Sequence, residues 1–415
     1  MSRKFLLLAA ALLLGSCSQQ KKASSPLAHD AYVWQRLWSP SVADTIAEHA
    51  TNFTALVVLH AEVTWRDGKP SVTRVPLDFE VLRRAKCRIG LALRIGAFGG
   101  PFQAADERSR FLISSARSLL DAARTNQLSV SELQLDFDCA ESKLDGYQVW
   151  VAAVRDAVRP APLTITALPS WLKHSSFKRL VAATDGYVLQ VHSLERPKTP
   201  DSPFALCDPQ LAVQAVQRAG RLGVPFRVAL PTYGYLLAFE PGGKFIGLSA
   251  EGPLRKWPEG STLREVRAQP ASVAGCVRTW SRERPEALRG IIWYRLPVAG
   301  DRLNWSWPTL ASVMAGRTPT FRLREELRKP QPGLVEIDLL NLGDGDYEGA
   351  IQLKVRWRDA RLIASDGWSG FENLVAGPDA LRFQARELRL LAGDRRAIGW
   401  LRLDKETEVQ IETDR

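Results

Sequence analysis

Eight strand-like segments alternate with helix-like segments over roughly 285 residues, and this alternation restricts the fold more than any other feature. The predicted strands are 32–38, 54–63, 88–95, 132–138, 163–169, 186–193, 225–231 and 290–296. Amphipathic segments such as 106–124, 145–158 and 208–222 predict helices between them. We therefore expect a (β/α)8 barrel over residues 31–317. The long stretch 232–262, rich in Gly, Pro and aromatic residues, is expected as a loop on the active face of the barrel.

The pattern changes after about residue 318. Segments 335–359 and 381–404 alternate apolar and polar residues with period two and are broken by Gly and Asp turns. This pattern is typical of a small all-β sandwich, expected over 318–415. It carries no catalytic pattern, so we expect it to pack on the barrel; the alternative is contact with an envelope polymer or protein.

The N-terminus has a short basic segment at 2–4, an apolar run at 5–14 and then Leu14-Gly15-Ser16-Cys17. This resembles a bacterial lipoprotein signal with its lipobox. The resemblance implies a signal over 1–17, acylation of Cys17, and a flexible tether over 18–30. Ser18 after the Cys favours the outer membrane, so we expect a cell-envelope protein that touches the membrane only through its lipid. The alternative is an ordinary secretory signal with an incidental Cys.

The net charge of +11 favours acidic partners. The basic residues are dispersed, without a Lys/Arg block and without zinc-finger or P-loop spacing, so nucleic acid is not expected. The spacing of Cys87, Cys139, Cys207 and Cys276 is wide and irregular. This spacing indicates no metal site and leaves the disulfide pairing open. We expect no cofactor.

Two carboxylates stand in the fourth predicted strand. Leu133, Leu135 and Phe137 share the face that must meet the helices, so Asp136 and Asp138 point into the barrel. Burying an isolated carboxylate is costly, so such groups are normally paired or functional. The alternation in the other strands gathers further side chains at this end of the barrel. They are Trp34, Arg36, His60, Glu62, Arg94, Gln190, His192, Tyr233, Trp293 and Arg295.

This set of residues suits sugars, because aromatic rings stack on pyranoses while polar groups bond their hydroxyls. Asp138 is the first candidate for acid–base work, Asp136 modulates it, and Glu141 is the rival acid. Trp34, Trp293 and Tyr233 would line sugar subsites. Arg36, Arg94 and His192 would bind hydroxyls or an acidic substituent. The alternative for the set is an ion network that closes the barrel, with Arg94 paired to Asp136.

The Asp-x-Asp of this strand resembles the strand-four signature of family-18 chitinases, Asp-x-x-Asp-x-Asp-x-Glu, in which the Glu is the acid. Asp136 and Asp138 match the last two Asp, but the first falls on Leu133 and the acid position on Ala140. Glu141 is one residue late, which reverses a side chain in a strand. Trp293 is similar to the Trp that floors the sugar site in those enzymes.

A second resemblance covers residues 31–300. The phrases AYVWQRLW, LQLDFDCAESKLDGY, LTITALPSWL and VLQVHSLERP resemble the bacterial domain-of-unknown-function family numbered 3142. The resemblance implies an envelope protein with a glycosidase-type barrel and no particular reaction.

Three functions follow. The first is a glycoside hydrolase or related carbohydrate-active enzyme of the envelope. The second is a non-catalytic glycan-binding or scaffolding lipoprotein on a degenerate barrel, which the displaced Glu141 supports. The third is a metal-assisted hydrolase, whose ligands would be His60, Glu62, Asp136, Asp138 and His192.

Overall fold

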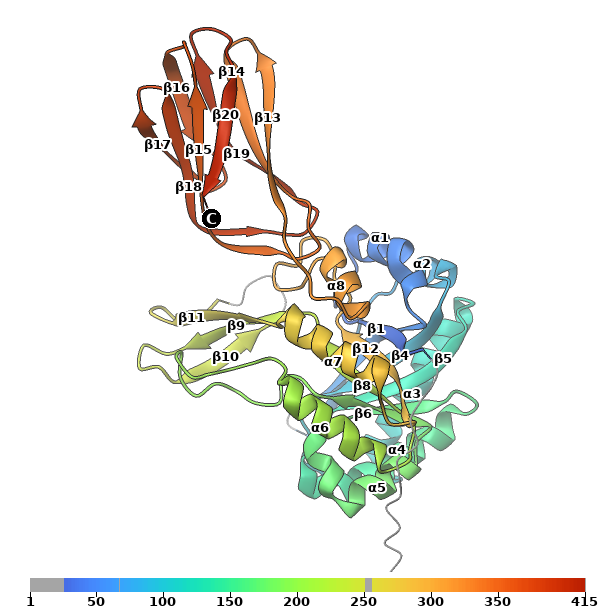
Figure 1. Ribbon diagram of the computed structural model, residues 1–415. Helices are drawn as coiled ribbons and strands as arrows, with labels where there is room; N and C mark the ends of the chain where they lie inside the picture. The colour runs from blue at the N-terminus through green and yellow to red at the C-terminus, as the bar shows by residue number, and fades with distance from the viewer. Residues whose placement is uncertain (1–25, 67, 251–255, 415) are drawn as a thin grey trace, which may run out of the picture.

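The computed structural model describes residues 26–66, 68–250 and 256–414, and its first part is a closed parallel barrel (Figure 1). The barrel strands are β1 (Ala28–Val33), β2 (Ala55–Arg66), β4 (Arg88–Ile95), β5 (Val130–Phe137), β6 (Leu163–Ala167), β7 (Gly186–Gln190), β8 (Phe226–Pro231) and β12 (Leu288–Tyr294). Their order is β1-β12-β8-β7-β6-β5-β4-β2, and β1 also pairs with β2. The strands therefore close on themselves, which confirms the predicted (β/α)8 class.

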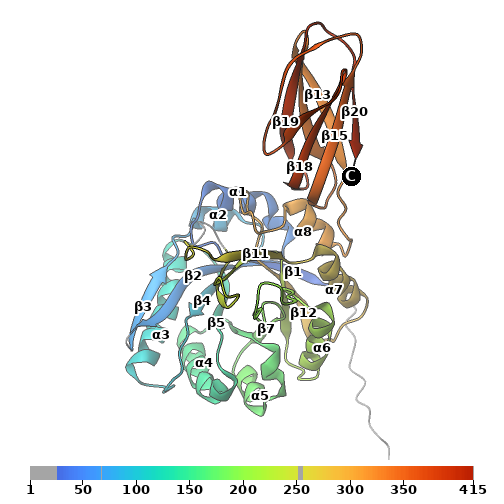
Figure 2. The same cartoon turned by 90° about the vertical axis from the view of Figure 1, so that its left-hand side faces the viewer.

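Helices surround the strands (Figure 2). They are α1 (Pro40–His49), α2 (Phe79–Arg84), α3 (Glu107–Thr125), α4 (Leu144–Val158), α5 (Ser175–Ala182), α6 (Pro209–Gly220), α7 (Pro270–Arg282) and α8 (Trp307–Met314). The start of α6 shows why the sequence signal was clear: Asp208 accepts the amides of Gln210 and Leu211 at 2.8 and 3.0 Å, and Pro209 fits the first turn. Within the described ranges, no helix is long and apolar enough to span a membrane.

Two features extend the barrel. Strand β3 (Lys69–Arg74) forms a hairpin with β2. The stretch expected as a loop after β8 instead contains an antiparallel sheet of three strands, β9 (Gly234–Phe239), β10 (Phe245–Ser249) and β11 (Thr262–Arg267), in the order β10-β9-β11. This sheet projects from the face where the barrel strands end (Figure 1). The stretch expected as a loop therefore contains strands of its own: Pro241, Gly242 and Gly243 lie in the turn between β9 and β10, whereas Gly234 and Gly247 lie within strands.

The C-terminal part is an all-β domain of two four-stranded sheets, as predicted. Its strands are β13 (Leu323–Gln331), β14 (Leu334–Asn341), β15 (Tyr347–Trp357), β16 (Leu362–Gly367), β17 (Glu372–Gly377), β18 (Ala380–Leu390), β19 (Arg395–Leu403) and β20 (Val409–Asp414). The turn before β15 binds the barrel through Asp344, which accepts a 2.8 Å hydrogen bond from Ser312 of α8. The two domains thus meet through polar contacts.

All four cysteines outside the N-terminal segment are free thiols, so the pairing left open above does not occur in this structure. Cys17 and the signal and tether expected before residue 26 lie outside the described residues.

Candidate active site

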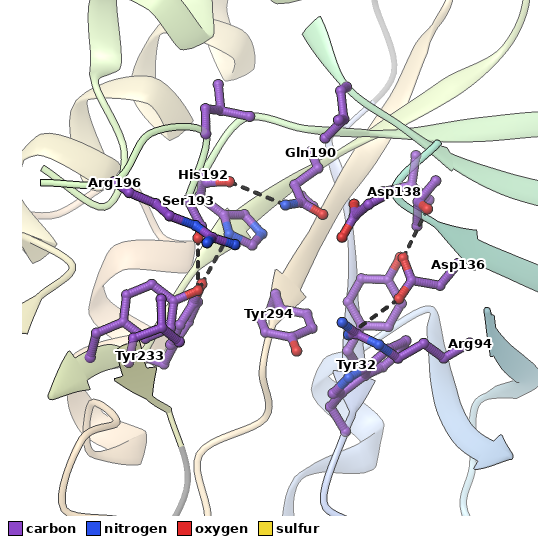
Figure 3. Close-up of a pocket in the computed structure, with 18 of the residues that line it drawn as sticks. Tyr32, Arg94, Asp136, Asp138, Gln190, His192, Ser193, Arg196, Tyr233 and Tyr294 are labelled. Atoms are coloured by element: carbon purple, nitrogen blue, oxygen red, sulfur yellow. Dashed lines mark hydrogen bonds and ion pairs between the residues drawn. The ribbon is translucent and has the colours of Figure 1, made fainter. Parts of the chain in front are cut away.

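A cavity of about 580 Å³ opens where the barrel strands end (Figure 3). This is the size of a small-molecule site, which spans about 300–1,000 Å³. The predicted site residues that line it are Trp34, Arg94, Asp136, Asp138, Gln190, His192 and Tyr233. The predicted residues outside its lining are Arg36, His60, Glu62, Glu141, Trp293 and Arg295. Alternation along the strands therefore located the cavity, and about half of the predicted site residues line it.

Asp136 and Asp138 come from β5 and the residue after its end. Leu135 and Phe137 pack against the helices in the outer core, so the two carboxylates turn to the barrel axis. Oδ1 of Asp136 accepts a 2.8 Å hydrogen bond from the hydroxyl of Thr166 on β6. Asp136 is partly buried, with 13% of its side chain exposed, whereas Asp138 is exposed at the cavity mouth. The cavity thus holds one largely covered and one accessible carboxylate, side by side on one wall (Figure 3).

The environment of Asp136 favours its neutral form. Burial raises the pKa of this carboxyl above its usual value, and the charge of Asp138 raises it further. The guanidinium of Arg94, with Nη1 3.6 Å from Oδ2, and the Thr166 hydrogen bond act in the opposite direction. The net shift is upward. A pair of adjacent carboxylates of this kind retains a proton to higher pH than an isolated one.

A chain of charges continues from Arg94 away from the cavity. Nε of Arg94 lies 3.6 Å from Oε1 of Glu62, and Arg36 binds both oxygens of Glu62 at 2.8 Å. The ion network foreseen as the structural alternative therefore exists. It occupies one side of the barrel mouth and leaves Asp138 accessible.

Hydroxyl groups and a histidine form the opposite wall. The Tyr233 hydroxyl lies 3.3 Å from Nδ1 of His192 and 2.9 Å from the Tyr235 hydroxyl, which lies 2.7 Å from Oγ of Ser193. Burial lowers the pKa of His192 to about 3, so its ring is neutral. Its Nε2 is buried and has no hydrogen-bond partner in the part of the chain that the structure describes.

Aromatic rings make the floor. Tyr294 stacks on His192 with a ring separation of 5.3 Å and contacts Tyr32, Trp34 and Tyr233 at 5.6, 5.5 and 5.3 Å. The indole N–H of Trp34 is buried and unpartnered within the described residues. The floor therefore offers flat apolar surfaces with a few polar atoms, the combination that suits a sugar ring.

The structure corrects the orientation of β12. Trp293 was expected to face the cavity, but it lies in the outer core, where its ring stacks on His29 and its Nε1 donates a 3.1 Å hydrogen bond to Nδ1 of that residue. Tyr294 faces inward instead. Residues 291–294 are apolar or aromatic on both faces, so the sequence had no polar alternation to set the orientation. Arg295, beyond the strand, pairs with Asp301.

The structure also moves His60 away from the cavity. The pairing of β2 with β4 shifts register between Leu59 and Ala61, so Leu59 faces the barrel interior and Ala61 the helices. His60, at this bulge, packs edge-on against Phe79 with ring centroids 5.8 Å apart. Burial lowers its pKa to about 4. A bulge changes which face of the sheet each following residue occupies, and no residue type in this segment indicates a bulge.

Glu141 does not reach the cavity either. It begins the short 3-10 turn η2 (Glu141–Lys143), where its carboxylate lies 2.6 Å from Nε2 of His174 and 3.0 Å from Nζ of Lys173. These hydrogen bonds lower its pKa to about 2. The position of the chitinase acid is held by Ala140, which is exposed. Among the described lining residues, the carboxylates are therefore Asp136 and Asp138.

Sequence reasoning missed several lining residues, which are Tyr32, Thr166, Ser193, Arg196, Tyr235 and Tyr294. Thr166 lies between apolar residues in β6, so alternation along that strand could have identified it. Ser193 and Arg196 lie in a loop without periodicity and gave no signal. His60, Glu62, Asp136, Asp138 and His192 do not form a metal-binding group, and no such group of three or more occurs in the described ranges.

The comparisons agree with this geometry. Residues 100–299 match the family model described as Domain of unknown function (DUF3142). No curated protein matches the chain. Among solved structures, the spore cortex-lytic enzyme SleL of Bacillus megaterium shares 12% identity at a TM-score of 0.50, over 71% of this chain and 75% of its own. A chitinase from Chromobacterium violaceum shares 15% identity at a TM-score of 0.47, over 70% and 98%.

The likeness to SleL is one of fold, at an identity too low to transfer an activity. The family match confirms the resemblance seen in the sequence, because it includes the segments that carry Asp136, Asp138 and His192. The chain thus has a (β/α)8 barrel with a fold like that of SleL, and its residues 100–299 match the DUF3142 family model.

Proposed function

We propose that this protein is a glycoside hydrolase of the bacterial cell envelope, in which Asp138 is the proton donor. The observation that carries the proposal is the carboxylate pair of β5. Asp138 is exposed in a cavity with an aromatic floor, and Asp136 beside it has a raised pKa. Barrel enzymes carry their chemistry at this end of the strands. A protonated carboxylic acid near a second carboxylate is the recurrent acid of glycoside hydrolysis.

In the proposed reaction, the bond between the anomeric carbon and the glycosidic oxygen breaks while Asp138 gives its proton to that oxygen. Burial raises the pKa of the neighbouring Asp136, so that carboxyl holds its proton to higher pH and places less negative charge beside Asp138. Both carboxylates come from one strand face, so they approach the sugar from the same side. The electron pair that replaces the leaving group must then come from the opposite side. We assign it to a neighbouring group of the substrate, as in substrate-assisted glycosidases.

Water completes the reaction. It attacks the anomeric carbon while the bond from that carbon to the neighbouring group breaks and returns its electron pair to the group. The ionised Asp138 accepts the proton that the water loses, which restores the acid. The neutral His192, whose Nδ1 is engaged with Tyr233, would form part of the wall beside the sugar. Tyr294 and Trp34 would support the ring face.

The envelope location is proposed from the lipobox at Cys17, which lies outside the described residues. Strand β1 enters the barrel at Ala28, at the end of the strands opposite the cavity. A lipid on Cys17 would tether the protein from that side. The cavity would then face away from the membrane and toward envelope or external glycan.

A second candidate is glycan binding without hydrolysis. The observation that favours it is the acid position itself: Ala140 holds it, and the carboxylate of Glu141 is bound to His174 and Lys173. A barrel that keeps the aromatic floor while its acid is displaced would bind a sugar and leave it intact.

The two candidates separate in one experiment. Protein starting at Ser18 is tested for binding on a glycan array and for release of reducing ends, as wild type, Asp138→Asn and Glu141→Gln. Each variant replaces one carboxylate by its amide, and only position 138 lines the cavity. Hydrolysis predicts release by wild type and by Glu141→Gln, with loss of about 100-fold or more in Asp138→Asn. Binding by all three proteins without release contradicts hydrolysis and supports the second candidate.

A further inference from the structure

Among the residues that the structure describes, two arginines line the cavity, and they differ in how they are bound. Arg94 is paired with Asp136 and Glu62. Arg196 also lines the cavity and is exposed, yet no hydrogen bond or ion pair of its side chain occurs in the described ranges. In Figure 3 its side chain extends into the cavity from the side opposite Asp136 and Asp138. One wall therefore carries the carboxylates, and the other carries a guanidinium without an ion-pair or hydrogen-bond partner among the described residues.

The loop that presents Arg196, between β7 and α6, is held in place. Ser193 has a φ of 56°, in the left-handed region that is unfavourable for a residue with a side chain. Its hydroxyl is fixed by the Tyr235 hydroxyl at 2.7 Å. On the other side of Arg196, the carbonyl of Pro200 accepts a 2.7 Å hydrogen bond from Arg264 of β11. Both anchors come from the sheet inserted after β8, so the base of Arg196 is positioned relative to the cavity.

A guanidinium matches planar and tetrahedral anions, which it binds through two parallel N–H donors. It cannot lose its charge at ordinary pH, and a neutral sugar offers it no opposite charge. The net charge of +11 attracts acidic polymers to the protein as a whole. A sugar chain whose glycosidic oxygen lies at Asp138 would extend across the cavity toward Arg196 (Figure 3).

We infer that the cavity selects an acidic glycan and that Arg196 determines this specificity by binding an anionic substituent, a carboxylate, sulfate or phosphate, of the sugar across the cavity from Asp138. This inference rests on the proposed function, because it names the substrate class of the same site. Arg94 is not the selecting residue, since its charge is already paired.

The test compares matched pairs of tetrasaccharides. One pair alternates an N-acetylhexosamine with a hexuronic acid, and its partner has each carboxylate reduced to an alcohol. Two other pairs are sulfated and desulfated, and phosphorylated and dephosphorylated. Binding is measured by calorimetry at low and high salt, and release of reducing ends is measured in parallel. The proteins are wild type, Arg196→Gln, Arg196→Lys and Arg221→Gln. Arg221, exposed after α6 and outside the cavity lining, controls for the loss of one positive charge.

We expect wild type and Arg221→Gln to prefer the anionic member of at least one pair by about tenfold or more, as a hydrogen bond to a charged group provides. Arg196→Gln should lose this preference, and Arg196→Lys should restore part of it. High salt should reduce the preference in wild type. The pair that shows the preference identifies the anion.

The outcomes distinguish this inference from the proposed function. Equal binding of both members of every pair by wild type overturns the inference, and so does a preference that survives in Arg196→Gln. Release of reducing ends without anion preference leaves hydrolysis standing and removes only the role of Arg196. Anion-dependent binding without release supports acidic-glycan recognition and contradicts hydrolysis. Absence of binding to all six glycans contradicts both.

Discussion

The hydroxyl of Thr166 donates a 2.8 Å hydrogen bond to Oδ1 of Asp136 and so joins the β6 wall to the candidate catalytic pair. This bond favours the ionised carboxylate, because a hydroxyl donor stabilises negative charge. It opposes the effect of burial, which raises the pKa of Asp136. The hydrogen bond between Thr166 and Asp136 therefore influences how readily the Asp136 carboxyl holds a proton.

Replacing Thr166 by Val should therefore raise the pKa of Asp136 further. The pH profile of reducing-end release should move to higher pH by roughly 0.5–1 unit, which is the effect of one hydrogen bond on a carboxyl group. Thr164→Val is the matched control: Thr164 lies on the same strand, but its hydroxyl donates to Glu132 at 2.7 Å, in the barrel interior away from the pair. An unchanged profile in Thr166→Val, or an equal shift in both variants, would contradict this role.

Asp136→Asn should not destabilise the protein at neutral pH. The folded protein raises the pKa of Asp136, so this group favours folding most at pH below its unfolded value of 3.8 and progressively less as pH rises through its folded pKa. Above that pKa the buried charge is a cost, and the amide removes it while Arg94 keeps Glu62 as partner. We expect the melting temperature to be equal or a few degrees higher at pH 7, and no such gain at pH 3.5. Scanning calorimetry at both pH values measures this, and a lower melting temperature at pH 7 would show that the ionised pair stabilises the barrel.

His60 should lower the unfolding free energy of the protein in acid without affecting glycan binding in the cavity. Its pKa is lowered from 6.5 to about 4, so its stability contribution is complete above pH 6.5 and falls as pH decreases toward 4. Between pH 7 and 5 this single group accounts for about 2 kcal/mol of lost unfolding free energy. Urea unfolding of His60→Gln should show a loss smaller by that amount, while glycan binding stays unchanged. The same pH dependence in variant and wild type would contradict the assignment.

Substitutions at the adjacent residues Trp293 and Tyr294 should have different effects: the first should lower stability, and the second should weaken glycan binding. Trp293→Phe removes the hydrogen bond to His29 and part of the outer core, so it should lower the unfolding free energy by about 1–3 kcal/mol and leave glycan binding intact. Tyr294→Ala should weaken glycan binding at least tenfold, because it removes the centre of the cavity floor. Denaturation and calorimetry with a bound oligosaccharide measure both. Weaker binding in Trp293→Phe at temperatures where it is folded would restore the role first expected for that residue.

The parts of the site that were predictable lie on strands with a clear polar and apolar alternation. In β5, Leu133 and Leu135 mark the helix-facing side, so Asp136 had to face the cavity. Arg94 and His192 followed from the same argument. The closed barrel was predictable because its eight strands and their helices recur in order along the chain.

The remaining errors have local causes. Residues 291–294 are hydrophobic on both faces, so nothing in the sequence separates Trp293 from Tyr294. The register shift in β2 reverses the faces around His60, and a bulge depends on how the partner strand pairs. Glu141 leaves the strand in a 3-10 turn that binds His174 from a distant segment. Such features depend on tertiary contacts, so the hydrophobic periodicity of a single segment does not predict them.

The most direct test of the account is a crystal structure of Asp138→Asn with a bound oligosaccharide that the wild type cleaves. We expect a sugar ring on Tyr294 and the glycosidic oxygen about 2.6–3.2 Å from the side chain at position 138, the reach of a proton donor. A glycosidic oxygen beyond the reach of that side chain, or an oligosaccharide bound outside the cavity, would contradict it.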